Sequence, residues 1–184
     1  MRRVIISVLG PDRPGIIAAT ARILFDNACN IENVSQTILQ NEFSGIFIVT
    51  TPAELGIGDL NERLRQGLAP LRQHVFVKAV SDAPPVFDTG ASEPFVITTR
   101  GPDQKGLVAR ITEVIARHGV NVTNLQAVFR GGEAPGDNIM IYEVDVPPET
   151  DAEELQQDLR ERARELGLTI SIQHRRIFET INRV

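Results

Sequence analysis

The sequence has very little of the chemistry that ties small proteins together covalently or through metals. Its 184 residues include one cysteine, three histidines and no tryptophan. A single cysteine excludes an intrachain disulfide and a cysteine cluster for metal, so Cys29 is expected to be a small buried apolar side chain. The histidines, at positions 74, 118 and 174, are too dispersed for zinc-ligand spacing, and His118 is expected to interact with a helix C-terminus.

Catalytic patterns are equally scarce. No serine or cysteine stands with a histidine in a recognisable nucleophile and base arrangement. The sequence therefore predicts a protein that is not an enzyme and has no cofactor and no metal site.

Long apolar runs and an excess of basic residues are also missing. No segment approaches the roughly 20 apolar residues of a membrane span, and none behind Met1 resembles a signal peptide, so a cytoplasmic protein is expected. Asp and Glu number 24 against 19 Lys and Arg, a formal charge of −5, which disfavours direct binding to nucleic acid or an anionic membrane. The 42% hydrophobic and 23% charged content is that of an ordinary globular protein.

What the sequence does contain is an internal repeat. The segment GPDRPG at 10–15 recurs as GPDQKG at 101–106, and identical residues flank both copies at one constant offset. After a longer loop in the second half, GGEAPG at 131–136, the offset rises by four and then holds to the end of each half. Two complete copies of one domain are therefore predicted, 1–81 and 94–184, joined by a linker at 82–93.

Each copy has the same order of predicted elements. The first half reads as a strand (3–9), a helix beginning near Pro14 and ending about Asn27, a hairpin (31–40, 44–51), a helix (59–73) and a strand (75–80). In the second half, Gly119 is expected to cap a helix, Thr150 and Glu153 have capping-box spacing before a helix at 151–166, and a strand follows at 169–177. The order βαββαβ predicts an α+β fold: two ferredoxin-like domains, each an antiparallel four-stranded sheet with both helices on one face.

The repeated turn can bind a small zwitterion. A helix that begins after Asp12 offers N–H groups and the positive end of its dipole to a carboxylate, while Asp12 and the Asn30 amide could take an ammonium group. Gly10 and Gly15 would let a ligand approach the backbone closely. Simpler roles stay open: Asp12 capping the helix, and Asn30 and its counterpart Asn121 holding the turn before a strand.

These residues resemble the ACT domain, a regulatory module that binds amino acids. The resemblance covers nearly the whole chain twice and is carried by a strand, the segment 10–16, an apolar helix and Asn30-Ile31. Val34 to Ile38 is similar to small single-domain ACT proteins. The tandem pair resembles glycine cleavage system transcriptional repressors and stand-alone ACT proteins. The resemblance to ACT domains implies ligand-binding residues at Gly10, Asp12, Gly15 and Asn30, and at Gly101, Asp103, Gly106 and Asn121.

The resemblance implies an amino-acid ligand, with glycine and serine the leading candidates, and a protein partner, such as a transcription activator or an enzyme, together with a possible homodimer. The second loop departs from the pattern because Gln104 and Lys105 replace Arg13 and Pro14.

Other readings stay open. A detached regulatory subunit of an amino-acid enzyme is the main alternative. RNA binding is another, because βαββαβ is also the order of RNA-recognition domains, although Phe43 and Phe47 are the only aromatic residues of the first hairpin. The basic runs at 160–164 and 174–176 are expected to be solvated surface, with a docking patch as the alternative for the second.

Overall fold

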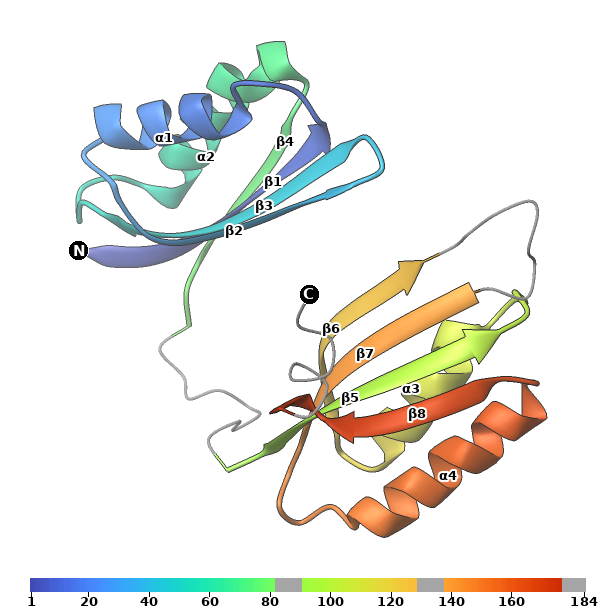
Figure 1. Cartoon of the computed structure of the whole chain (residues 1–184). Coiled ribbons are helices and arrows are strands. Elements are labelled where there is room, and N and C mark those ends of the chain that lie inside the picture. Colours follow the sequence, from blue (N-terminus) through green and yellow to red (C-terminus); the bar gives the residue numbers. More distant parts are fainter. Residues whose placement is uncertain (82–90, 129–137, 177–184) are drawn as a thin grey trace. The chain divides into compact units, whose positions relative to one another are not determined.

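The computed structural model describes residues 1–81, 91–128 and 138–176, and the chain divides into two compact units, Met1–Ala83 and Pro84–Val184 (Figure 1). The predicted loop at 131–136, most of the predicted linker and Ile177 lie outside the described residues.

The first unit has the predicted order of elements, with the bounds β1 Arg2–Pro11, α1 Ile16–Asp26, β2 Asn30–Leu39, β3 Glu42–Thr51, α2 Ile57–Leu68, a 3₁₀ turn Ala69–Leu71 and β4 His74–Ala79. The second unit repeats it as β5 Glu93–Gly101, α3 Leu107–Arg117, β6 Asn121–Val128, β7 Asn138–Val146, α4 Ala152–Glu165 and β8 Thr169–His174.

Each unit contains one antiparallel sheet, with strand orders β2-β3-β1-β4 and β6-β7-β5-β8. Both helices of a unit cover the same face of its sheet (Figure 1). The prediction of two ferredoxin-like βαββαβ domains is confirmed.

The core of each unit lies between the sheet and its two helices. Along β1 the side chains of Val4, Ile6 and Val8 are fully buried, and the residues between them point to the opposite face. They pack against the apolar stripes of α1 and α2. In the second unit, Tyr142 is the largest buried side chain of the equivalent cluster.

Several predicted helix ends are wrong, each for a local reason. Helix α1 begins at Ile16, not near Pro14, because Gly15 before it has a left-handed backbone with φ 99°. Helix α2 ends at Leu68, and the 3₁₀ turn that follows closes at Arg72, also left-handed. The cap of α4 is Asp151, whose carboxylate accepts hydrogen bonds from the backbone N–H groups of Glu153 and Glu154.

The predicted cap at Thr150 fails because its hydroxyl is used elsewhere, donating to the His118 carbonyl oxygen at 3.1 Å. The predicted cap at Gly119 is confirmed, since this residue follows α3 with φ 70° and its N–H donates to the Ala116 carbonyl oxygen.

Candidate functional site

The first loop is held against the hairpin of its own sheet. Strand β1 ends with Pro11 opposite Glu42, and the Asp12 N–H donates to the Asn41 carbonyl oxygen at 2.7 Å. Gly15 then turns the chain into α1 with a backbone conformation that glycine adopts without strain. The loop therefore lies beside the β2–β3 turn and leads directly into a helix N-terminus.

Asp12 does not cap that helix. Gly15 is the capping position, and α1 begins without any side-chain hydrogen bond to its first N–H groups. The Ala19 N–H is the first to find a partner, the Gly15 carbonyl oxygen. The capping role considered for Asp12 is thus wrong, and the first N–H groups of α1 stay open to other acceptors.

An open hollow of about 460 Å³ lies at this helix N-terminus. It is bounded by the loop, the first turn of α1 and facing residues of β2 and β3, namely Asp12, Arg13, Gly15, Ile16, Ile17, Ala18, Gln36 and Phe43. Asp12 is exposed, whereas Phe43 is buried and supplies an apolar wall. The hollow combines an anion, a cation, an amide and apolar surface.

Arg13 is the charged residue of this hollow that sequence reasoning missed, and Gln36 and Phe43 were also not predicted. Its Nε is buried without a hydrogen-bond partner, and its guanidinium makes no ion pair with any described residue. A guanidinium carries five N–H donors, so leaving it unmatched in a partly buried place is unfavourable unless a ligand or water satisfies it. Arg13 sits beside Asp12 in the repeated motif, which was the available signal.

The first and last glycines of each repeated loop serve different purposes. A Cβ at Gly10 would lie 2.6 Å from the Arg72 carbonyl oxygen, and one at Gly101 would lie 2.6 Å from Leu168 Cδ2. These glycines therefore let the segment after the second helix pack closely against the end of the first strand of each unit. Gly15 and Gly106 have open space around them and are needed for their φ values of 99° and 86°.

Neither asparagine lies near the loop of its own domain. Asn30 is opposite Thr50, which is opposite Arg3, whereas the loop begins after Pro11 at the other end of β1. Eight strand positions correspond to about 27 Å at roughly 3.4 Å per residue. The structure places Asn121 in the same way, opposite Asp145 at the far end of its sheet. Within one domain, Asp12 and Asn30 do not share a ligand.

The second loop is built differently. Asn138 takes the place of Phe43 opposite the loop glycine, is buried, and donates from Nδ2 to Asp103 Oδ1 at 3.4 Å. Its own Oδ1 is buried without a partner. Gln104, at the position of Arg13, donates from Nε2 to the Leu166 carbonyl oxygen at 2.6 Å. Of the four residues predicted for the second site, Asp103 and Gly106 lie in this loop and Gly101 is the last residue of β5 before it. Asn121 lies at the far end of the sheet.

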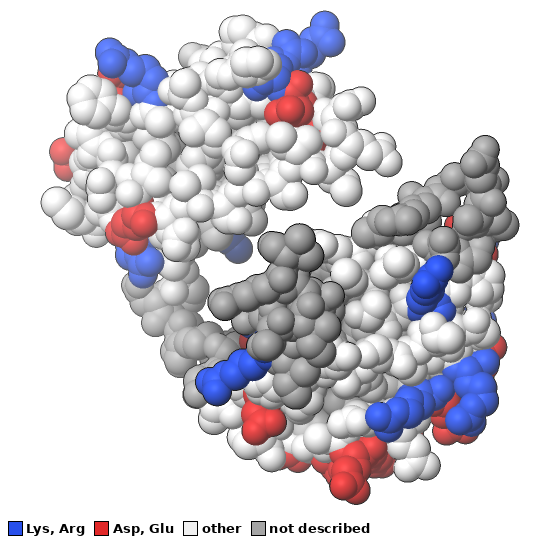
Figure 2. Space-filling model, in the orientation of Figure 1, with Lys and Arg blue, Asp and Glu red and all other residues white. Residues whose placement is uncertain are grey.

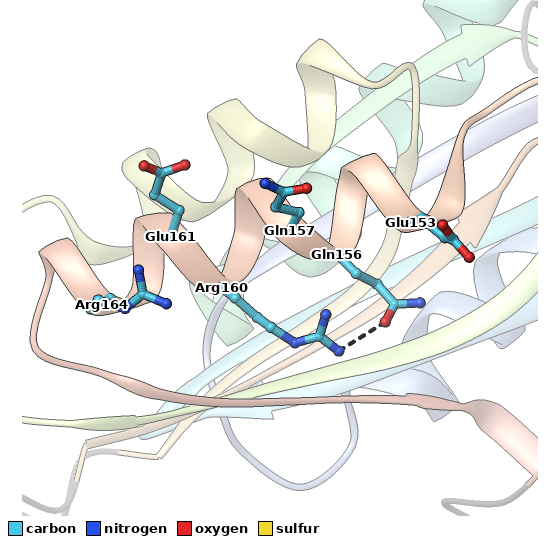
Figure 3. Close-up of a pocket in the computed structure, with 6 residues that line it drawn as sticks. All are labelled: Glu153, Gln156, Gln157, Arg160, Glu161 and Arg164. Atoms are coloured by element: carbon cyan, nitrogen blue, oxygen red, sulfur yellow. Dashed lines mark hydrogen bonds between the residues drawn. The ribbon is translucent and has the colours of Figure 1, made fainter.

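A second hollow lies along α4 and is lined by that helix alone (Figure 3). Arg160 donates to Gln156 at 2.9 Å, while Gln157 and Glu161 point away from that pair. Acidic and basic groups alternate without converging on one point, which supports the interpretation of the 160–164 run as a solvated helix face.

Two of the basic residues at 174–176, the last residue of β8 and the one after it, are engaged within their own domain. Arg175 lies 3.3 Å from Glu143 and 3.8 Å from Asp145, and His174 packs edge-on against Phe95 at 5.4 Å between ring centroids. On the face drawn in Figure 2, basic and acidic side chains stand next to one another. Neither observation supports a free basic docking patch.

RNA recognition through the first sheet is disfavoured by burial. Phe43 and Phe47 are 2% and 1% exposed and point toward the helices, so they cannot stack on bases.

Two titratable groups outside the hollows have shifted pKa values for local reasons. His118 lies 2.9 Å from Asp158 Oδ2, and hydrogen bonds from His118 and Arg117 lower the pKa of the Asp158 carboxyl. Cys29 is half-buried against the first core rather than fully buried, and burial raises the pKa of its thiol. In the described ranges no cluster of metal-ligating side chains occurs, and no helix there is long and apolar enough to span a membrane.

Comparison with known proteins agrees with this architecture. The family model described as ACT domain matches residues 2–78 and again 93–173. A UPF0237 protein of Methanopyrus kandleri is 35% identical over 79 residues, which are 42% of this chain and 88% of that protein. A UPF0237 protein of Methanocaldococcus jannaschii is 37% identical over 79 residues with the same coverage.

Two solved structures match the whole fold. A protein of unknown function from Galdieria sulphuraria gives a TM-score of 0.77 at 22% identity, covering 94% of this chain and 98% of that one. A candidate glycine cleavage system transcriptional repressor gives 0.69 at 18% identity, covering 94% and 96%. At these identities the likeness shows the fold alone, but the family match extends over most of both halves. The chain belongs to the ACT-domain family and carries two ACT domains in tandem.

Proposed function

We propose that the protein is a non-catalytic regulator that binds a small amino acid at the first loop and acts through contacts with another protein. The observation that carries the proposal is the hollow at the N-terminus of α1, where the exposed Asp12 carboxylate adjoins the unpartnered Arg13 guanidinium. An α-amino acid presents an ammonium and a carboxylate at a fixed separation, so it complements this pair.

The chemistry of such binding follows from the groups present. The ligand carboxylate would accept from Arg13 and from the uncapped N–H groups of α1, which lie at the positive end of the helix dipole. The ligand ammonium would donate to Asp12 and to the Gln36 amide oxygen. Phe43 supplies an apolar wall on one side of the hollow. Glycine and serine are the leading ligands because the fold is shared with a candidate glycine cleavage system transcriptional repressor.

The output would pass through a partner. The fold is shared with a candidate glycine cleavage system transcriptional repressor, which supports a role in regulating transcription of amino-acid catabolism in the cytoplasm. A detached regulatory subunit of an amino-acid enzyme would use the same site. Affinity purification separates the two, since the first requires a transcription regulator as partner and the second an enzyme. A homodimer is compatible with either.

The test is calorimetric titration of the full chain with glycine and with serine. Asp12→Asn is expected to weaken binding at least tenfold, because it removes the charge that pairs with the ammonium. Asp26→Asn is the matched control: this exposed carboxylate lies at the other end of α1 and pairs with Arg22. Absence of binding to a chain that circular dichroism shows to be folded would refute the proposal.

A further inference from the structure

Both domains tie the loop to the segment just after their second helix, but they use different residues to do it. In the first domain Gln73 Nε2 donates to the Pro11 and Leu71 carbonyl oxygens, each at 2.9 Å. Gln73 is 5% exposed and lies just before β4. The donor therefore comes from the strand side, and the loop contributes only the backbone carbonyl oxygen of Pro11 and no side chain.

In the second domain the same link is made from the opposite side. Leu168 stands where the first domain has Gln73, and its apolar side chain cannot donate a hydrogen bond. The carbonyl oxygen of Leu166, the counterpart of Leu71, instead accepts from Gln104 Nε2 at 2.6 Å. The equivalent carbonyl oxygen after the second helix thus accepts a hydrogen bond in both domains, from a residue beside β4 in the first and from a loop residue in the second.

The donor differs between the two domains, Gln73 in the first and Gln104 in the second, and this exchange of donors decides which loop side chain is available to a ligand. Arg13 and Gln104 occupy equivalent positions of the repeat. Because Gln73 makes the link in the first domain, Arg13 is left without a partner at the edge of the hollow. In the second domain the side chain at that position, Gln104, already donates to the Leu166 carbonyl oxygen.

We propose that the two loops have diverged, so that the chain binds one carboxylate ligand, at Arg13, while the second loop is structural. The inference rests on the proposed function above and adds which domain binds and which group selects the ligand. The buried Asn138 in place of Phe43 supports it, since the second loop also lacks the apolar wall of the first. Lys105 is the remaining cation of the second loop, and it is exposed.

The first test is stoichiometry and charge selectivity, measured by calorimetry on the full chain with glycine and with glycinamide, which lacks the carboxylate. We expect one glycine per chain and at least tenfold weaker binding of glycinamide. Arg13→Gln, which installs the residue of the second loop, should weaken glycine at least tenfold and abolish the preference over glycinamide. Gln104→Ala and Lys105→Ala are the matched variants and should leave glycine affinity within twofold of the parent.

The outcomes separate the two proposals. Two glycines per chain, unchanged binding in Arg13→Gln, or loss of binding in Lys105→Ala would overturn the inference and leave amino-acid binding standing. No binding of either probe by the folded chain would overturn the proposed function, and this inference with it.

A second measurement tests the exchange itself without any ligand. In the Gln73→Leu background the Leu71 carbonyl oxygen has lost its donor, so adding Arg13→Gln should raise the melting temperature, because glutamine can then make the link as Gln104 does. In the native background Gln73 already fills that role, and Arg13→Gln should give no such gain. If Arg13→Gln changes the melting temperature equally in both backgrounds, the proposed exchange of donors between Gln73 and Gln104 is wrong.

Discussion

Tyr142 shows how burial alone changes the chemistry of a residue. Its side chain is fully buried in the second core, its hydroxyl lies 3.3 Å from Met140 Sδ, and burial raises its pKa from 10.0 to about 12. The neutral form is favoured in the folded protein, so its contribution to stability is complete below pH 10 and is lost as the pH rises toward 12.

The prediction is that alkaline pH destabilises the second domain by about 3 kcal/mol through Tyr142, from a shift of roughly two pKa units at about 1.4 kcal/mol each. The chain has one tyrosine and no tryptophan, so the near-ultraviolet absorbance of tyrosinate reports this residue alone. In Tyr142→Phe the free energy of unfolding should decrease less between pH 10 and pH 12 than in the parent protein. A tyrosinate transition centred at pH 10 in the folded protein would contradict the assignment.

Ala28 and Gly119 occupy equivalent positions after α1 and α3, and both have left-handed backbones, with φ 54° and 70°. A left-handed residue with a Cβ costs about 1 kcal/mol, partly offset by the extra entropy of glycine in the unfolded chain. Ala28→Gly should therefore raise the free energy of unfolding of the first domain by about 0.5 kcal/mol.

Denaturant titration measures the change, and Gly119→Ala serves as the reciprocal variant, expected to destabilise the second domain by a similar amount. If both substitutions destabilise, backbone conformation is not what distinguishes the two positions.

Among the elements, α4 depends on its cap. Asp151 accepts from the N–H groups of Glu153 and Glu154, each at 3.0 Å, and its charge lies at the positive end of the helix dipole. Asp151→Ala is expected to lower the stability of the second domain by about 1 kcal/mol, and Asp151→Asn by much less, because asparagine caps equally well.

Thermal unfolding followed by circular dichroism measures both variants. Equal losses for the alanine and asparagine variants would show that charge, and not the capping hydrogen bonds, is what α4 needs.

Elements of this protein were predictable in order but not at their ends. Apolar spacing located α1 and α3 because each must bury one stripe, and the constant offset of the repeat located α2 and α4. The ends were set by residues whose partners are distant in sequence, as when Thr150 bonds to the His118 carbonyl and leaves the cap to Asp151. Periodicity contains no information about such partners.

At the scale of the molecule, the duplication produced two cores from one pattern. Ile6 and Ile97 are equivalent residues of the central strands β1 and β5, 0% and 1% exposed, and each belongs to a cluster made only of residues of its own unit. Truncating a buried isoleucine to alanine costs about 2 to 5 kcal/mol.

Ile6→Ala is therefore expected to speed amide exchange in β1 and β3, and Ile97→Ala in β5 and β7. Hydrogen exchange with peptide resolution reads both variants in one experiment, each serving as the control for the other. Ile6→Ala speeding exchange in the second unit as much as in its own would contradict two separate cores.

The sequence by itself determined the tandem architecture and the position of the loops, because a repeat and its turn residues are local patterns that recur in order. It also pointed to Asp12. Only the tertiary structure decided that Asn30 lies at the far end of the sheet, that Gly10 accommodates the Arg72 carbonyl, and that Arg13 is unpartnered. These facts depend on strand register and on contacts between segments some 60 residues apart along the chain, such as Gln73 with Pro11, which local patterns do not encode.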